Sequence, residues 1–194
     1  MISTYDSENK LWSGMKIPYP LPSDVFLGNK ILEGLEAYPD RVLQVLHDDG
    51  TKLIAKEFRL SIIRVAQNLI KQGVGENDVV GLSCLNSHEV CVLLNACVLI
   101  GAPTNPLDVA FKLNDIQHIF GQTKPKLVVC DYEIQLRIKK ALKKLKNDAP
   151  IYTTCGKIAG YPQFEELMKP TGDEDNFVAT SMGKAFGYCL YFWH

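Results

Sequence analysis

The feature that most constrains the fold is an apolar run at residues 79–85 that leads directly into an apolar helix. The run, Val-Val-Gly-Leu-Ser-Cys-Leu, shows no alternation of polar and apolar positions. A strand of this kind is buried on both faces, as in a parallel sheet. Asn86 and Glu89 have the spacing of a capping box, so they predict a buried helix that extends to about Leu99 and ends at Gly101.

The same order of strand and helix recurs along the chain. Further buried strands are expected at residues 127–130 and 151–154, and residues 164–168 suit one helical turn. Apolar spacing predicts helices over residues 25–38, 56–72, 113–120 and 132–146. Strands that alternate with helices indicate βαβ units, so we predict an α/β fold with a parallel sheet. Residues 41–54 instead predict a short β-hairpin, because Asp48-Asp49-Gly50 is typical of a tight turn.

Three parts of the chain differ in character. Residues 1–22 are polar and contain three prolines, which predicts an extended N-terminal arm. Residues 23–177 carry the α/β pattern. Residues 178–194 contain Lys184 as the single charged residue, and five of the last nine residues are aromatic. This divergent aromatic tail is either a terminal strand packed on the core or a segment foreign to the preceding fold.

Composition excludes several function classes. The net charge of -1, from 21 basic and 22 acidic residues, gives no overall attraction to nucleic acid. The longest apolar stretch, residues 90–102, is shorter than the roughly 20 residues of a membrane span. The first residues lack the apolar core of a signal peptide. We therefore expect no transmembrane segment, no nucleic-acid partner and, by default, a cytoplasmic protein.

One helix departs from this balance. Residues 137–146 contain six basic residues in ten, and Leu136, Ile138, Leu142 and Leu145 supply an apolar stripe. Such a helix binds a membrane surface or nucleic acid, or it forms a solvated outer face of the fold. The second interpretation is favoured, because the rest of the chain offsets the charge.

Catalytic and metal motifs are incomplete. His88-Glu89 would begin a zinc-protease helix only with a second histidine at position 92, where Val92 stands. Gly183-Lys184 lacks the remaining residues of a phosphate loop. The six cysteines contain no Cys-x-x-Cys pair, and we expect them to be core residues. The four histidines show no nucleophile–base arrangement: His47, His88, His118 and His194. We therefore assign no catalytic, cofactor-binding or metal-binding residue.

Six segments, taken together, resemble one family. They are YPDRV at 38–42, AQNL at 66–69, NDVVGL at 77–82, NSHE at 86–89, IGAPTNP at 100–106 and TKPKLV at 123–128. In this order and spacing they are similar to the N-terminal part of the AMP-forming adenylating enzymes, which include acyl-CoA synthetases, 4-coumarate-CoA ligases and beetle luciferases. The likeness covers about residues 17–177 and is greatest to insect luciferase-like acyl-CoA synthetases. It implies that residues 23–177 are a partial AMP-binding domain, the incomplete N-terminal portion of the family's large domain.

The resemblance also implies a chemistry. The family joins a carboxylate to ATP with Mg²⁺, releases pyrophosphate and passes the acyl group from the acyl-adenylate to coenzyme A. Its Ser/Thr/Gly-rich phosphate loop would begin where this chain enters residues 178–194, and no such loop is present. We therefore expect a truncated chain that alone binds no ATP, Mg²⁺ or coenzyme A and is not catalytic. Relatives are often peroxisomal, but Phe192-Trp193-His194 is not a peroxisomal tripeptide.

A second hypothesis is a non-enzymatic interaction module. A partial sheet leaves an unpaired strand edge and exposed apolar surface, and aromatic residues are enriched at protein interfaces. In this hypothesis the 178–194 tail pairs with a full-length relative or another protein.

Overall fold

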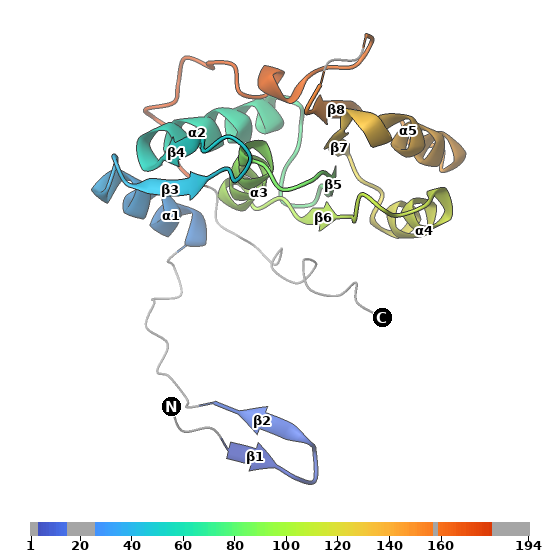
Figure 1. Cartoon of the computed structure of the whole chain (residues 1–194), viewed down its shortest axis with the longest axis horizontal. Coiled ribbons are helices and arrows are strands. Elements are labelled where there is room, and N and C mark those ends of the chain that lie inside the picture. Colours follow the sequence, from blue (N-terminus) through green and yellow to red (C-terminus); the bar gives the residue numbers. More distant parts are fainter. Residues whose placement is uncertain (1–3, 15–25, 157–158, 180–194) are drawn as a thin grey trace.

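The computed structural model describes residues 4–14, 26–156 and 159–179, with its elements labelled in Figure 1. The prolines of the predicted arm and residues 180–194 of the aromatic tail lie outside these ranges. Their predictions therefore stay predictions.

A four-stranded parallel sheet forms the centre of the fold. Its strands are β5 (Val80–Ser83), β6 (Thr104–Pro106), β7 (Leu127–Asp131) and β8 (Ile151–Thr154), in the order β6-β5-β7-β8. All three pairings are parallel, and Val80 lies opposite both Thr104 and Leu127. The α/β fold with a parallel sheet is thereby confirmed. Strand β6 was not predicted, because Pro103 precedes it and Pro106 ends it, and proline is tolerated in a strand mainly at a sheet edge.

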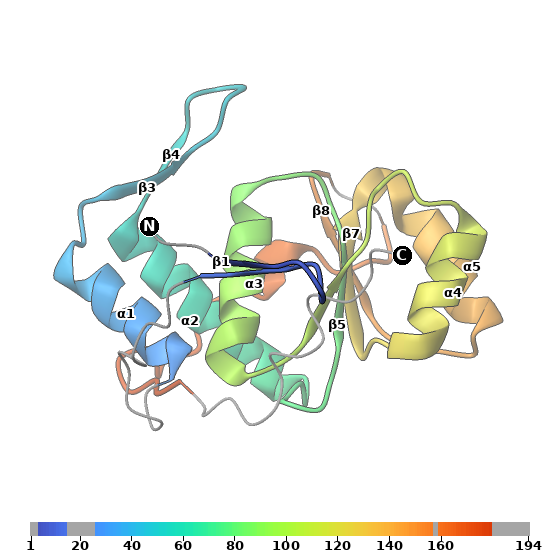
Figure 2. The same ribbon diagram turned by 90° about the horizontal axis from the view of Figure 1, so that it is seen from below.

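Helices cover both faces of this sheet (Figure 2). The helices of one face are α1 (Leu27–Ala37), α2 (Ala55–Lys71) and α3 (His88–Ile100). The other face carries α4 (Leu113–Thr123) and α5 (Gln135–Lys144), and a 3₁₀ turn η1 (Tyr132–Ile134) precedes α5. Successive side chains of β7 enter opposite cores, with Val129 in the first and Val128 in the second. The continuous apolar pattern of the strands therefore reflects burial on two sides.

The helices are found where they were predicted, but several of their boundaries differ. Ser87, and not Asn86, is the N-cap of α3, because its extended backbone places Oγ 3.3 Å from the Val90 amide, which donates to it. The end of α3 at Gly101 is confirmed, with a φ of 68°. The helix predicted over residues 132–146 begins as η1 and ends at Lys144.

Residues 4–13 form a β-hairpin in place of the predicted extended arm. Strands β1 (Thr4–Asp6) and β2 (Leu11–Ser13) pair antiparallel, and the rings of Tyr5 and Trp12 lie 4.9 Å apart. The Asp6 carboxylate stabilises the turn, because its Oδ1 accepts hydrogen bonds from the amides of Glu8 and Asn9. The prediction for residues 1–22 rested on their polar and proline-rich composition and therefore missed the turn that Asp6 stabilises.

The second hairpin was predicted correctly. Strands β3 (Val42–Val45) and β4 (Lys52–Ile54) pair antiparallel, and Asp49 Oδ1 accepts a hydrogen bond from the Thr51 amide at 2.8 Å. Exposed apolar side chains lie on this hairpin and directly before it: Tyr38, Val42, Leu43 and Val45.

The chain returns to α2 after β8. A 3₁₀ turn η2 (Phe164–Glu166) buries Phe164 fully. Beyond it, Asn68 Nδ2 donates to the Leu167 carbonyl at 2.8 Å, and Arg64 Nε donates to Glu174 Oε1 at 2.9 Å. Residues about 100 positions apart are thus held together by polar contacts. Near the sheet, Thr153 of β8 donates its amide to the Pro162 carbonyl and bridges to Gln163, so part of the β8 edge is covered.

Gly81 of β5 is packed so closely by its neighbours that a larger side chain has no room there. A Cβ there would lie 2.9 Å from Phe120 Cζ and 3.2 Å from a Val128 methyl, and the Phe120 ring is fully buried. We predict that Gly81→Ala lowers the free energy of unfolding by about 1–3 kcal/mol, the usual cost of overpacking a core. Urea unfolding followed by circular dichroism measures this.

Gly34 is the matched control, because a Cβ there meets nothing within 4 Å. It lies in α1, where Gly34→Ala is expected to raise stability by roughly 0.5–1 kcal/mol. Equal effects of the two substitutions would show that the contact between β5 and α4 is not tight.

Acid is expected to weaken the attachment of residues 167–174 to α2. The Arg64 guanidinium and the amides of Thr171 and Gly172 hold the pKa of Glu174 down at about 2. A lowered pKa contributes stability above the unfolded value near 4.5, and that stability is lost as the pH falls toward 2. We predict that Glu174→Gln flattens the pH dependence of stability between these values. Glu165→Gln, at an exposed position, should leave the pH dependence unchanged in the same unfolding titration.

Candidate functional site: the carboxyl edge of the sheet

Open parallel sheets bind ligands at the carboxyl ends of their strands. Here β5, β7 and β8 end close together, since Ser83 pairs with Cys130 and Asp131 pairs with Thr154. The polar groups at this edge are therefore the first candidates for a site.

Asp131 is the central group of this edge. Its side chain is buried, with 6% of the residue exposed. One carboxylate oxygen accepts a hydrogen bond from the Leu85 amide at 2.8 Å, and the other accepts from Thr154 Oγ1 at 2.7 Å. Both oxygens are thus used to join the ends of three strands. Sequence reasoning did not single out Asp131, although an acidic residue directly after a buried strand was a signal that could have done so.

The cysteines near this edge are not activated. Cys84 Sγ lies 3.6 Å from Thr154 Oγ1, and burial raises the pKa of Cys84 to about 12. Burial also raises the pKa values of Cys130 and Cys155. Thiols in this state are poor nucleophiles and poor metal ligands at neutral pH.

The prediction of core cysteines is confirmed for Cys97 and Cys130, and it holds in part for Cys84 and Cys91, which pack against the first core. Cys97 and Cys130 are buried, whereas Cys84 and Cys91 are half-buried. The prediction is wrong for Cys155, which is exposed directly after β8. Cys189 lies outside the described residues.

The candidate histidines are not brought together: His47 is exposed on the β3–β4 hairpin, and two others have separate structural partners. His88 Nδ1 lies 2.9 Å from Gln44 Oε1, so it links α3 to the β3–β4 hairpin. His118 contacts Gln122 one turn along α4, at 3.2 Å. His194 lies outside the described residues. Within the described ranges, no group of three or more His, Cys, Asp or Glu side chains is placed to hold a metal ion.

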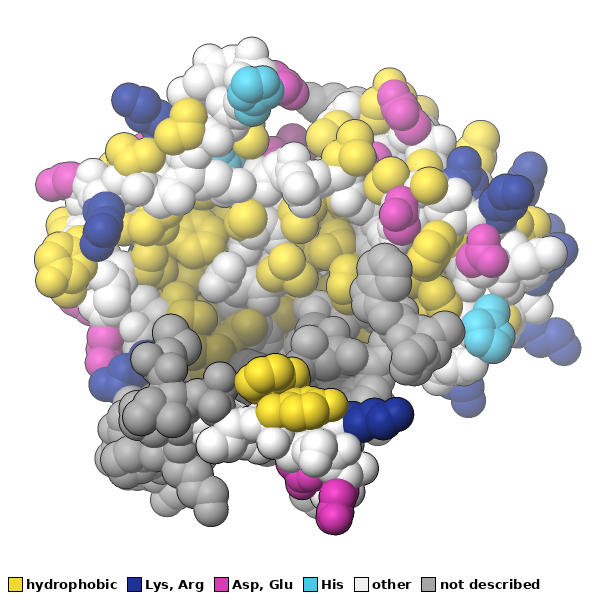
Figure 3. All heavy atoms as spheres, turned by 60° about the horizontal axis from the view of Figure 1, so that its bottom comes forward, with side chains coloured by type: hydrophobic (Ala, Val, Ile, Leu, Met, Phe, Trp, Pro, Cys, Tyr) yellow, Lys and Arg dark blue, Asp and Glu magenta, His cyan; other side chains and the backbone are white. Residues whose placement is uncertain are grey.

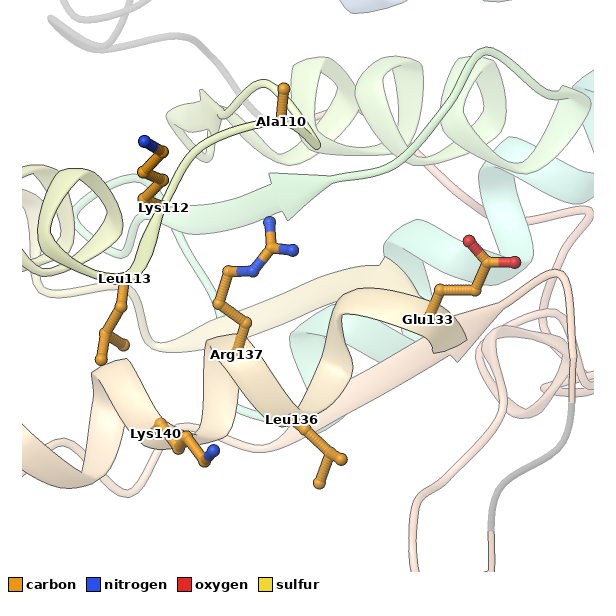
Figure 4. A pocket seen from close by; sticks show the side chains of 7 residues that line it. All are labelled: Ala110, Lys112, Leu113, Glu133, Leu136, Arg137 and Lys140. Carbon is orange, nitrogen blue, oxygen red and sulfur yellow. The ribbon is translucent and has the colours of Figure 1, made fainter.

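A cavity of about 580 Å³ lies beside α5 (Figure 4). Its lining includes Lys112, Arg137, Lys140 and Glu133 together with apolar side chains. Arg137 extends toward the loop that precedes α4, and its Nη1 donates to the carbonyls of Val109 and Phe111 at 3.0 and 2.8 Å. The cavity therefore offers positive charge for binding an anion, while its arginine supports the loop.

The chain is an α/β protein with helices on both faces of an open parallel sheet and polar groups at its carboxyl edge, the edge at which sheets of this kind bind ligands. A family model described as AMP-binding enzyme matches residues 33–181. The chain therefore belongs to the family of AMP-binding enzymes.

Two relatives illustrate the likeness. A medium/long-chain-fatty-acid–CoA/3-oxocholest-4-en-26-oate–CoA ligase of Mycobacterium marinum is 26% identical over 113 residues, which are 58% of this chain and 20% of the ligase. The structure of the luciferase-like enzyme of the nonluminescent mealworm Zophobas morio aligns with a TM-score of 0.78 and 28% identity. That alignment covers 84% of this chain and 39% of the mealworm enzyme. The chain thus spans well under half the length of either relative.

The described helices are too short or too polar to cross a membrane. The cellular compartment stays a prediction.

Asp131→Asn tests the structural role of the carboxyl edge. An amide has only one acceptor oxygen, so its NH₂ group must face the Leu85 amide or the Thr154 hydroxyl, both of which donate to Asp131. We predict a loss of about 1–3 kcal/mol in the free energy of unfolding. The measurement is urea unfolding, with Asp148→Asn as an exposed control that should change stability by less than about 0.5 kcal/mol. Similar values for both variants would remove Asp131 from this role.

Proposed function

We propose that this chain forms the N-terminal scaffold of an AMP-forming carboxylate–CoA ligase. The observation that carries the proposal is the alignment of 84% of the chain with a luciferase-like enzyme at 28% identity. The likeness to a fatty-acid–CoA ligase supports a fatty acid as the carboxylate. ATP, Mg²⁺ and coenzyme A would then be used by a longer protein that contains this scaffold.

The reaction has two displacement steps. A carboxylate oxygen attacks the α-phosphate of ATP and pyrophosphate leaves; the coenzyme A thiol then attacks the acyl carbonyl and AMP leaves. Both steps require preorganised donors or cations where negative charge develops. The carboxyl edge offers Asp131, whose oxygens are already used, and thiols that stay protonated. Lys112, Arg137 and Lys140 line the cavity beside α5 instead. We therefore infer that the 194-residue chain alone does not form acyl-adenylate.

Carboxylate-dependent exchange of pyrophosphate into ATP tests this inference. The purified chain, mixed with fatty acids of six to eighteen carbons, is expected to give no exchange above a buffer blank. Exchange that depends on the added acid would overturn the inference.

A chimera tests the scaffold assignment itself. Residues 27–177 would replace the aligned segment of the Zophobas morio enzyme, whose remaining segments would supply the chemistry. We expect the chimera to be soluble and to retain whatever adenylating activity the parent shows in the same assay. A folded chimera that has lost the parent's activity would count against the assignment.

The alternative, a non-enzymatic module that pairs through residues 178–194, depends on the aromatic tail. Of that segment the structure describes Val178, which is 76% exposed, and Ala179, which is buried near Gly28. The interaction hypothesis stays a prediction from the sequence.

A further inference from the structure

Basic charge is segregated onto one helix of this nearly neutral chain. Residues 137–146 hold six basic residues and no acidic one, whereas the rest of the chain holds 15 basic residues and all 22 acidic ones. Figure 3 shows Lys and Arg side chains gathered on the side of the molecule that α4 and α5 form. The acidic residues nearest along the chain, Glu133 and Asp148, flank this run rather than interrupt it.

The structure separates this run into two faces. Ile138, Ala141 and Leu142 are buried in the second core. The opposite face, which we call the lysine face, consists of exposed side chains: Leu136, Lys139, Lys140, Lys143 and Lys144. Arg137 belongs to neither face, since it supports the loop before α4. The apolar stripe predicted for this helix thus packs on the core, except for Leu136.

Within the described ranges, the lysines of this face form no ion pair with an acidic side chain. Among the residues that the structure describes, the ion pairs involve other side chains. Lys139 contacts an aromatic ring instead, with Nζ 5.2 Å from the centre of Tyr161. Lys139 and Lys143, like Lys140 and Lys144, are four residues apart on a helix, where like charges repel. The lysine face therefore carries concentrated charge that an external anion would neutralise.

Large apolar side chains adjoin the lysine face at its N-terminal end. Leu136 is 65% exposed; it lines the cavity beside α5 and points away from the loop that Arg137 supports. Tyr132 precedes it by one turn and is also exposed. Such side chains are poorly suited to water and to a phosphodiester backbone.

We propose that the lysine face, with Leu136 and Tyr132, docks on an anionic lipid surface. The lysines contact lipid phosphates and carboxylates, and the side chains of Leu136 and Tyr132 enter the headgroup region. Clustered lysines are attracted to anionic lipid, and adjacent exposed apolar side chains add buried area. The exposed Leu136 favours a membrane over a nucleic acid, since a nucleic acid offers this side chain no apolar partner. The proposal is independent of the proposed ligase function.

Flotation with lipid vesicles tests the proposal on the full 194-residue chain. We expect binding to vesicles of 70% phosphatidylcholine and 30% phosphatidylserine in 50 mM NaCl. Pure phosphatidylcholine vesicles should bind little, and 500 mM NaCl should release the protein, because salt screens the attraction. Each lysine near such a surface contributes about fivefold to binding. Changing Lys139, Lys140, Lys143 and Lys144 to Gln should therefore weaken binding by about 100-fold or more.

A matched variant separates this face from net charge. Lys52, Lys56, Lys71 and Lys169 are exposed lysines elsewhere, and their change to Gln alters the total charge equally. This control should lose less than about fivefold, by the same scale of one lysine. Equal losses in the two variants would overturn the assignment to α5. The double variants K139Q/K143Q and K140Q/K144Q remove repulsive pairs and provide folded alternatives, each with an expected loss of about 25-fold.

The apolar contribution has its own test. Leu136→Gln should weaken vesicle binding by about threefold or more, since it removes apolar area from the interface. Leu60→Gln, at an exposed leucine of α2, should leave binding unchanged. Anisotropy with a labelled 24-base-pair DNA duplex completes the design. Binding to the duplex without binding to the anionic vesicles would overturn the proposal, as would no binding to either.

Discussion

The burial of β5 and β7 on both faces is the constraint on which the rest of the structure depends. A strand that is buried on both faces needs a covering layer on each side. Helices α1, α2 and α3 therefore pack on one face of the sheet, and α4 and α5 pack on the other. Gly81 shows how close the second layer comes, because the Phe120 ring occupies the space of its missing side chain. Asp131 then connects the strand ends with buried hydrogen bonds. The polar groups at the carboxyl edge of the sheet therefore help to hold the packed strands together.

The pattern of apolar residues predicted much of this fold, because a strand that is buried on both faces has a continuous apolar sequence. The strands at 80–83, 127–131 and 151–154 and the covering helices were found in that way. Strand β6 was missed because Pro103 and Pro106 weigh against a strand, and only its place at the sheet edge makes Pro106 acceptable. The N-cap of α3 was misplaced by one residue because Asn86 and Ser87 are equally good caps, and backbone direction decides between them.

The candidate site was less predictable for a different reason. The role of Asp131 depends on Leu85 and Thr154, which are 46 and 23 residues away along the chain. No local pattern reports such a contact. The basic helix was visible in the sequence, but whether each side chain faces the core, the loop or the solvent followed from how α5 lies on the sheet. The family resemblance implied a type of reaction, but it did not show where these side chains lie.

The contacts of Thr153 with Pro162 and Gln163 make the two edges of the sheet unequal. A backbone segment already occupies part of the outer side of β8, so another strand cannot extend the sheet freely there. Among the described strands, the other edge is β6, next to β5. The β6 edge is thus the less obstructed of the two among the described strands. The bridge at Thr153 limits strand addition next to β8, because the chain itself already uses part of that strand's hydrogen-bonding edge.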